Sequence, residues 1–170
     1  VFRLTENPAI LILDYPNLRQ QGLALNRVAA FVEKAHLPRD RVLDDASLAA
    51  EVSRSGETIE SYYYGHDYGA DDMVRFFTTA DRDRIPLAAD EEALRDLLHQ
   101  EGLTAATKPG ALLSLPRVGP NSVDGFTRRV ILRHELSHGE FFANPTYRAF
   151  AHRAWNEILR PDERRAFLQF

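Results

Sequence analysis

Three side chains in the C-terminal half of the chain have the types and spacing needed to hold and use a metal ion: His134, Glu135 and His138, in the segment HELSH. On an α-helix, residues four positions apart lie about 40° apart around the axis and one turn apart along it. Both imidazoles can therefore point at one ion, as two zinc ligands do. Glu135 is rotated by about 100° from His134. That position suits a carboxylate that takes a proton from zinc-bound water, so the spacing predicts a zinc site with its own general base.

The plain alternative is an exposed helix with two titrating histidines and a solvated glutamate. The residues around the motif argue against it, because Val130, Ile131 and the pair Phe141–Phe142 make this one of the most apolar helices expected in the chain. An apolar helix lies centrally in a fold, and polar groups in such a place need partners. We therefore expect zinc binding.

A catalytic zinc ion needs a third protein ligand and one open position. Glu140 lies two residues after His138, about 200° around the helix, and should point away. His152 and Glu157 are expected on the next helix, where they diverge by about 140° and cannot both face the metal. Glu157 lies on the flank of the apolar stripe of that helix and His152 lies opposite it, so packing of the stripe on the first helix would bring Glu157 to the histidines. The stripe consists of Tyr147, Phe150, Ala151, Ala154, Trp155 and Ile158.

The segment HELSH, followed by eighteen residues and then by Glu157 in WNE, resembles the HExxH-x18-E signature of gluzincin zinc metallopeptidases. The resemblance covers residues 134–157. It implies that His134, His138 and Glu157 bind zinc and that Glu135 activates the water. The metzincin pattern is absent, because position 144 is Asn rather than a third His. The alternative for Glu157 is a surface carboxylate paired with Arg153 or Arg160.

Peptide hydrolysis also needs a donor for the oxyanion of the tetrahedral intermediate. Gluzincins usually take a His or Tyr from beyond the glutamate ligand, but residues 158–170 contain neither. Tyr147 is one candidate, and the stretch YYYGHDY (Tyr62–Tyr68) is another. The plain alternative for that stretch is aromatic packing with a turn at Gly65. Four residues also suggest calcium, although they lack the loop pattern of a calcium site: His66, Asp67, Asp71 and Asp72.

The elements that must position these residues are few strands and many helices. Two short apolar runs bounded by Pro or Gly, residues 9–15 and 111–118, are the strand candidates. Gly110–Val118 precedes the zinc helix, so it is either the edge strand that pairs with substrate or a plain core strand. We predict an α+β fold with one zincin-like domain over residues 1–170: a mixed α/β part over 1–120, then the zinc-site helices over 121–170.

Local signals place the helices. Asn144 is a good N-cap and Pro145 suits a first turn, so a helix should begin there. Either Asp71 or Asp72 is expected to cap another helix. The remaining helices are expected from Asn17 to about Leu37, over Asp45–Arg54, over Asp90–Gln100, and from Ser122–Thr127 through Phe142.

Composition excludes several classes of function. The net charge is −4, and acidic and basic residues are interspersed, so nucleic acid is not an expected partner. The absence of Cys excludes disulfides and thiolate metal sites. No apolar run is long enough to span a membrane and no signal peptide is visible, so we expect a soluble chain in an undetermined compartment. The chain begins without Met and ends in AFLQF, so we expect a processed or trimmed protein.

Together these features predict a zinc-dependent metallopeptidase that acts on a peptide or protein substrate. Water bound to Zn²⁺ and deprotonated by Glu135 would attack the peptide carbonyl. One rival is a binding or regulatory domain whose zinc has four protein ligands, with His152 or Glu140 completing the shell. Another is a metal hydrolase of a non-peptide amide, which the motif does not exclude.

Overall fold

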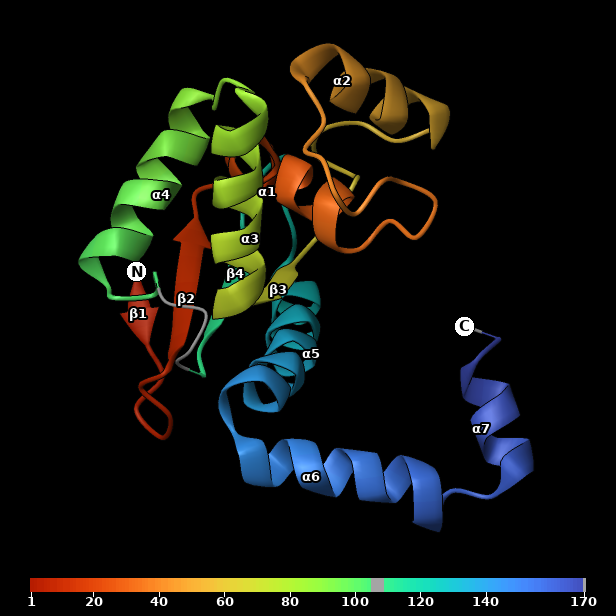
Figure 1. Cartoon of the computed structure of the whole chain (residues 1–170). Coiled ribbons are helices and arrows are strands. Elements are labelled where there is room, and N and C mark those ends of the chain that lie inside the picture. Colours follow the sequence, from red (N-terminus) through yellow and green to blue (C-terminus); the bar gives the residue numbers. More distant parts are fainter. Residues whose placement is uncertain (105–108, 170) are drawn as a thin grey trace.

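The computed structural model describes residues 1–104 and 109–169, and these form an α+β fold around a small mixed sheet (Figure 1). In the described part, the strand order in the sheet is β1-β2-β4-β3. β2 and β4 run parallel, whereas β1 and β3 pair antiparallel to their neighbours. The strands are β1 (Phe2–Arg3), β2 (Ile10–Tyr15), β3 (His66–Gly69) and β4 (Ala111–Pro116).

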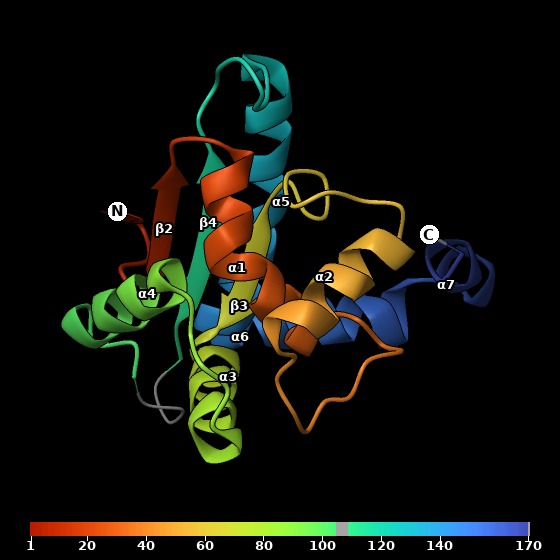
Figure 2. The ribbon, with the colours of Figure 1, turned by 90° about the horizontal axis from the view of Figure 1, so that it is seen from above.

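Helices cover both faces of the sheet. Three helices, α1, α3 and α4, lie on one face, and α5 lies on the other (Figures 1 and 2). The described helices are α1 (Leu18–Val32), α2 (Asp45–Arg54), α3 (Ala70–Asp83), α4 (Ala89–Gln100), α5 (Gly125–Ala143), α6 (Pro145–Arg153), the short π-helix η1 (Ala154–Ile158) and α7 (Pro161–Phe167).

Alternation along the two central strands divides the core between these faces. Leu11 of β2 and Leu112 of β4 belong to the cluster formed with α1, α3 and α4. Their neighbours Ile10 and Leu113 pack on the other side, with Ala143 of α5. Successive residues of a strand point to opposite faces, and a strand covered on both faces is apolar at every position. This double burial explains the continuous apolar runs in the sequence.

α5 lies unusually close to the sheet at Gly139. A β-carbon at this position would lie 3.1 Å from Leu113 Cδ1 and 3.3 Å from Ile10 Cδ1, which is tight for a methyl group. The helix begins where the side chain of Asp124 accepts a hydrogen bond of 2.7 Å from the backbone N–H of Thr127. The close crossing and the cap fix the position of α5, and with it that of the HELSH segment.

After α5 the chain turns away from the sheet. We call residues 145–169, which comprise α6, η1 and α7, the C-terminal arm; Figure 1 shows it extending from the end of α5. Asn144 is both the last cap of α5 and the N-cap of α6. Its Oδ1 accepts from the backbone N–H groups of Thr146 (3.1 Å) and Tyr147 (3.2 Å), and its Nδ2 donates to Glu140 Oε2 (3.0 Å).

Both strand candidates are confirmed, as β2 and β4, and so is the α+β class. The interpretation of Gly110–Val118 as a substrate-pairing edge is wrong, because β4 is paired on both sides, with β2 and β3. β1 and β3 were not predicted. The expected cap at Asp71 or Asp72 is also wrong: α3 is preceded by Gly69, and both aspartates lie in its first turn. No helix in the described ranges is long and apolar enough to cross a membrane.

Candidate metal centre

The two histidines of HELSH face each other on α5. Their Nε2 atoms are 3.2 Å apart, and the ring centroids are 4.8 Å apart. Two ligand nitrogens on a tetrahedral zinc ion, each about 2.0–2.1 Å from the metal, are separated by about 3.3 Å. Two neutral imidazoles that both present lone pairs cannot hydrogen-bond to each other, but they can share a cation. The pair therefore fits two adjacent ligand positions of zinc.

Glu135, which follows His134 on α5, is only 5% exposed. Its Oε2 atom has no hydrogen-bond partner among the described residues. Burial, together with the negative charges of Asp67 and Glu33, raises the pKa of Glu135 to about 9. In the metal-free protein this carboxyl group is therefore neutral at pH 7.

The segment before β3 passes directly against this carboxyl group at Gly65. A β-carbon there would lie 2.1 Å from Glu135 Oε1 and 2.6 Å from Ile131 Cγ2, distances that no side chain allows. Glycine is required here because of this close approach, not because of a turn geometry. The turn expected at Gly65 does not account for this contact with Glu135.

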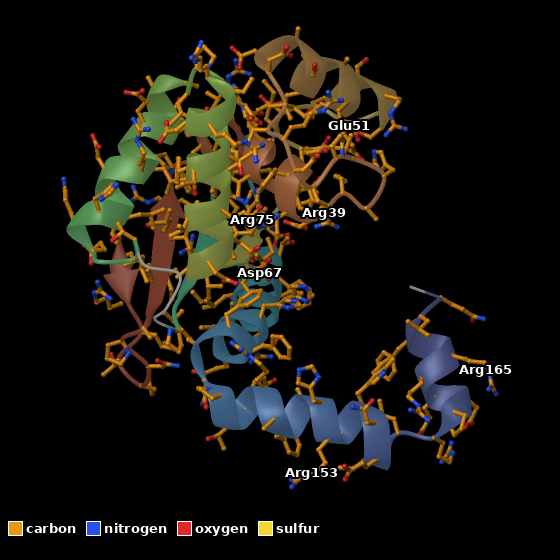
Figure 3. The ribbon with its side chains drawn as sticks, viewed as in Figure 1. Arg39, Glu51, Asp67, Arg75, Arg153 and Arg165 are labelled. Carbon is orange, nitrogen blue, oxygen red and sulfur yellow. The ribbon has the colours of Figure 1, made fainter. Side chains whose placement is uncertain are left out.

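Asp67, from β3, reaches the site from the other side. Its Oδ1 lies 3.7 Å from His138 Nδ1, and it hydrogen-bonds to Glu135, which acts as the donor. Burial raises the pKa of Asp67, although the neighbouring His138 opposes the shift. Figure 3 shows Asp67 beside α5, on the side of the molecule that faces the C-terminal arm.

The neighbours of Asp67 on β3 point to the opposite face of the sheet. His66 is buried, and its Nδ1 lies 2.8 Å from Ser114 Oγ and 3.2 Å from Gln21 Nε2. Burial lowers the pKa of His66 to about 3, so it is neutral at pH 7. Tyr68 is also buried and donates to Glu33 Oε1 at 3.0 Å. His66 and Tyr68 are thus core residues, and the plain packing interpretation holds for this part of YYYGHDY.

The calcium hypothesis is wrong for the same reason. His66 and Asp67 point to opposite faces of β3, and Asp72 pairs with Arg75 at 2.9 Å. These side chains do not converge. Within residues 1–104 and 109–169, no group of three or more His, Cys, Asp or Glu side chains is arranged to hold a metal ion. The expected ligands His134, His138 and Glu157 therefore do not form such a group in this structure.

Glu157 lies in η1 on the C-terminal arm, where it is exposed. The apolar stripe that was expected to pack on α5 is largely exposed too, at Tyr147, Phe150 and Ile158. The arm instead meets the end of α5 through Arg148, which donates to the backbone oxygens of Phe141 (2.8 Å) and Phe142 (2.5 Å). The ring of His152 lies 5.5 Å from that of Phe141. The expected packing of the apolar stripe on α5 is wrong, and the helical angles used for Glu157 do not apply. The stripe does not pack on α5, and residues 154–158 form a wider π-turn, in which 100° per residue no longer applies.

The other candidates lie apart from the histidine pair. Tyr147 is exposed on α6 and borders a shallow hollow with Phe150 and Arg153. Glu140 points away from the motif, as predicted, and accepts hydrogen bonds from Asn7 (3.3 Å) and Asn144 (3.0 Å). A zinc shell closed by Glu140 is therefore not supported.

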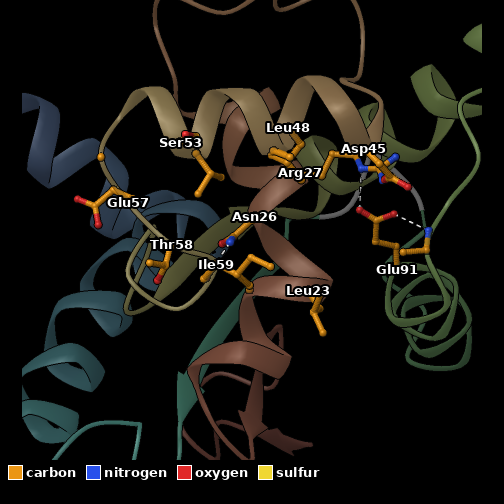
Figure 4. Close-up of a pocket in the computed structure, with 15 residues that line it drawn as sticks. Leu23, Asn26, Arg27, Asp45, Leu48, Ser53, Glu57, Thr58, Ile59 and Glu91 are labelled. Atoms are coloured by element: carbon orange, nitrogen blue, oxygen red, sulfur yellow. Dashed lines mark hydrogen bonds and ion pairs between the residues drawn. The ribbon is translucent and has the colours of Figure 1, made fainter.

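A separate cavity of about 670 Å³ lies between α1 and α2 (Figure 4). Leu23, Leu48 and Ile59 form part of its apolar wall. At one end, Arg27 and Glu91 form an ion pair at 3.0 Å, and both side chains are only 2% exposed. None of the histidines lines this cavity, so its size does not mark the chemistry of the HELSH segment.

Sequence reasoning missed Gly65 and Asp67 as members of the site. The signal for Asp67 was present in HDYG, where a polar residue alternates with two residues that become buried, but a four-residue strand is too short to recognise from alternation. No family model, no curated protein and no solved structure matches the chain. The site is therefore defined by its own geometry: two histidines at ligand spacing, a buried glutamate beside them and a strand carrying an aspartate.

Proposed function

We propose that the protein is a zinc-dependent hydrolase of peptide bonds. The observation that carries this proposal is the 3.2 Å separation of the His134 and His138 Nε2 atoms, with the buried Glu135 next to them. His134, His138 and Glu157 would hold the ion. Glu157 can join the histidines only if the C-terminal arm turns about Asn144 toward α5. Tyr147, the candidate oxyanion donor, lies on the same arm and would move with it.

The topology of the sheet favours a peptide as substrate. β3 is an edge strand, and its outer side has no strand partner in the described part of the chain. An extended peptide can add to such an edge through backbone hydrogen bonds. Because Asp67 of β3 adjoins His138, a peptide bound along this edge would pass the histidine pair. The substrate-binding role considered for Gly110–Val118 therefore belongs to β3.

The roles of the side chains follow from their surroundings. Zinc, when bound, polarises the carbonyl group and lowers the pKa of its water. Glu135 would take the proton of the attacking water and later donate it to the leaving amine. With the ion bound, its positive charge would favour the ionised carboxylate, so Glu135 would be available as a base.

A direct test is the metal content of the purified protein after zinc reconstitution, measured by elemental analysis. Wild type should retain about one zinc per chain. Glu135→Gln should retain it as well, whereas Glu157→Ala should lose most of it. Glu163→Ala is the matched control, because it removes another glutamate of the same arm. Full zinc retention in Glu157→Ala would remove Glu157 from the ligand set.

Cleavage of a fluorogenic peptide library then separates the enzyme from the non-catalytic rival. Wild type loaded with zinc should cleave, and Glu135→Gln should bind zinc but not cleave. Zinc binding without any cleavage would favour the binding or regulatory domain. Hydrolysis of simple amides but not of peptides would favour the non-peptide alternative, and no zinc binding in any variant would refute the proposal.

A further inference from the structure

We propose that Asp67 is a positioning residue of this centre, which orients His138 as a metal ligand and holds Glu135 in place. The inference rests on the proposed zinc site. It assigns to the edge strand β3 a function beyond substrate pairing: β3 would also supply the carboxylate that supports the metal-binding helix.

The contact with His138 has the geometry that this role needs. A histidine that binds a metal through Nε2 carries its proton on Nδ1 and usually donates it to a carboxylate or carbonyl oxygen. The Nε2 of His138 faces His134 at 3.2 Å, and its Nδ1 faces Asp67 Oδ1 at 3.7 Å. Such contacts are often long in the empty site and shorten in the loaded one. The carboxylate therefore selects the tautomer whose Nε2 is free to bind.

Asp67 is held rigidly enough to do this. Its two neighbours, His66 and Tyr68, are anchored in the core on the far face, by Ser114 and Glu33. Its own position is paired with Leu113 of the central strand β4. Because side chains alternate along a strand, these anchors force Asp67 toward α5.

The same carboxylate contacts the expected base. The side chains of Asp67 and Glu135 are hydrogen-bond partners, and the absence of a β-carbon at Gly65 leaves the space that Glu135 Oε1 occupies. Asp67 thus touches one metal ligand and the base at once. Its loss should weaken zinc binding through His138 and, separately, disturb the placement of Glu135.

The test measures zinc affinity by competition with a chromophoric chelator in wild type, Asp67→Ala and Asp67→Asn. Removal of such a supporting carboxylate typically weakens metal binding by about 10–100-fold, and this is the loss expected for Asp67→Ala. Asp67→Asn keeps an oxygen that can accept from His138 Nδ1, so its loss should be smaller. Asp71→Asn is the control, because it removes a neighbouring exposed carboxylate, and its affinity should match that of wild type.

A second readout separates positioning from folding. Cobalt(II) in place of zinc reports ligand geometry through its visible absorption, and the spectrum of Asp67→Asn should differ from that of wild type while the unfolding midpoints agree. Wild-type affinity and an unchanged cobalt spectrum in Asp67→Asn and Asp67→Ala would overturn the role of Asp67 and leave the zinc site intact. Failure of the wild-type protein to bind either metal would overturn both proposals.

Discussion

Substitution of Glu135 by Gln should stabilise the metal-free protein, and the gain should grow with pH. The carboxyl group is 5% exposed, and burial raises its pKa from the ordinary 4.5 to about 9. A group with a raised pKa contributes its stability in full below about pH 4.5. Between about pH 4.5 and 9 the unfolded chain releases this proton and the folded chain keeps it, so stability falls as pH rises.

The size of the effect follows from the difference between the two pKa values. At pH 7 the unfolded side chain lies about 2.5 pH units above its pKa, and each unit corresponds to 1.36 kcal/mol, which gives a loss of roughly 3 kcal/mol. The amide of Gln has the shape of the protonated acid and can still donate to Asp67, so Glu135→Gln removes the titration without removing the contact.

The assay is urea unfolding of chelator-treated protein at pH 5, 7 and 9. The free energy of unfolding of wild type should fall across this range relative to that of Glu135→Gln, with a difference of about 3 kcal/mol between the two at pH 7. Glu6→Gln, at an exposed position, controls for the loss of one carboxylate and should follow wild type. Parallel curves for wild type and Glu135→Gln would show that Glu135 is not protonated in the folded chain, and the description of the site would be wrong.

Two further substitutions test the packing that supports the site. Gly65→Ala places a methyl group 2.1 Å from Glu135 Oε1, so it should cost roughly 1–3 kcal/mol of stability and weaken zinc binding. Urea unfolding and chelator competition measure the two effects. Gly119→Ala is the control, because no atom lies within 4 Å of the added methyl group, and it should change neither stability nor zinc affinity. Arg27→Met removes the cation that pairs with the buried Glu91 at 3.0 Å and leaves Glu91 only its hydrogen bond from the backbone N–H of Ala88, so it should lower the free energy of unfolding by roughly 3–5 kcal/mol. The double variant with Glu91→Met should recover most of that loss, and equal stability of the single and double variants would contradict a buried ion pair.

Local features of the sequence predicted local structure well. β2 and β4 are visible as apolar runs because each is covered on both faces, and Asn144–Pro145 marks a helix start because its cap involves neighbouring residues alone. β3 was not predictable in this way: HDYG is short, contains no β-branched residue, and becomes a strand only because β4 offers it a partner. The pairing order of the sheet could not be predicted from single segments either, because it depends on contacts between them.

The same distinction between local and long-range contacts applies to the site. The relation of His134, Glu135 and His138 is set by one helix and was readable from their spacing. The contributions of Gly65 and Asp67 depend on contacts across about 70 residues of sequence, as between Asp67 and His138. The position of Glu157 depends on how one helix packs on another, and regular helical angles could not anticipate the π-turn that contains it.

The junction at Asn144 makes the length of the chain here as important as its residues. One side chain ends α5 and begins α6, so no slack loop lies between the two helices. Inserting a single residue into either helix would turn everything beyond it by about 100° and advance it by about 1.5 Å. Exposed positions of the arm should therefore accept many substitutions, whereas an insertion or deletion between His138 and Glu157 would leave every side chain intact and still aim the arm in the wrong direction.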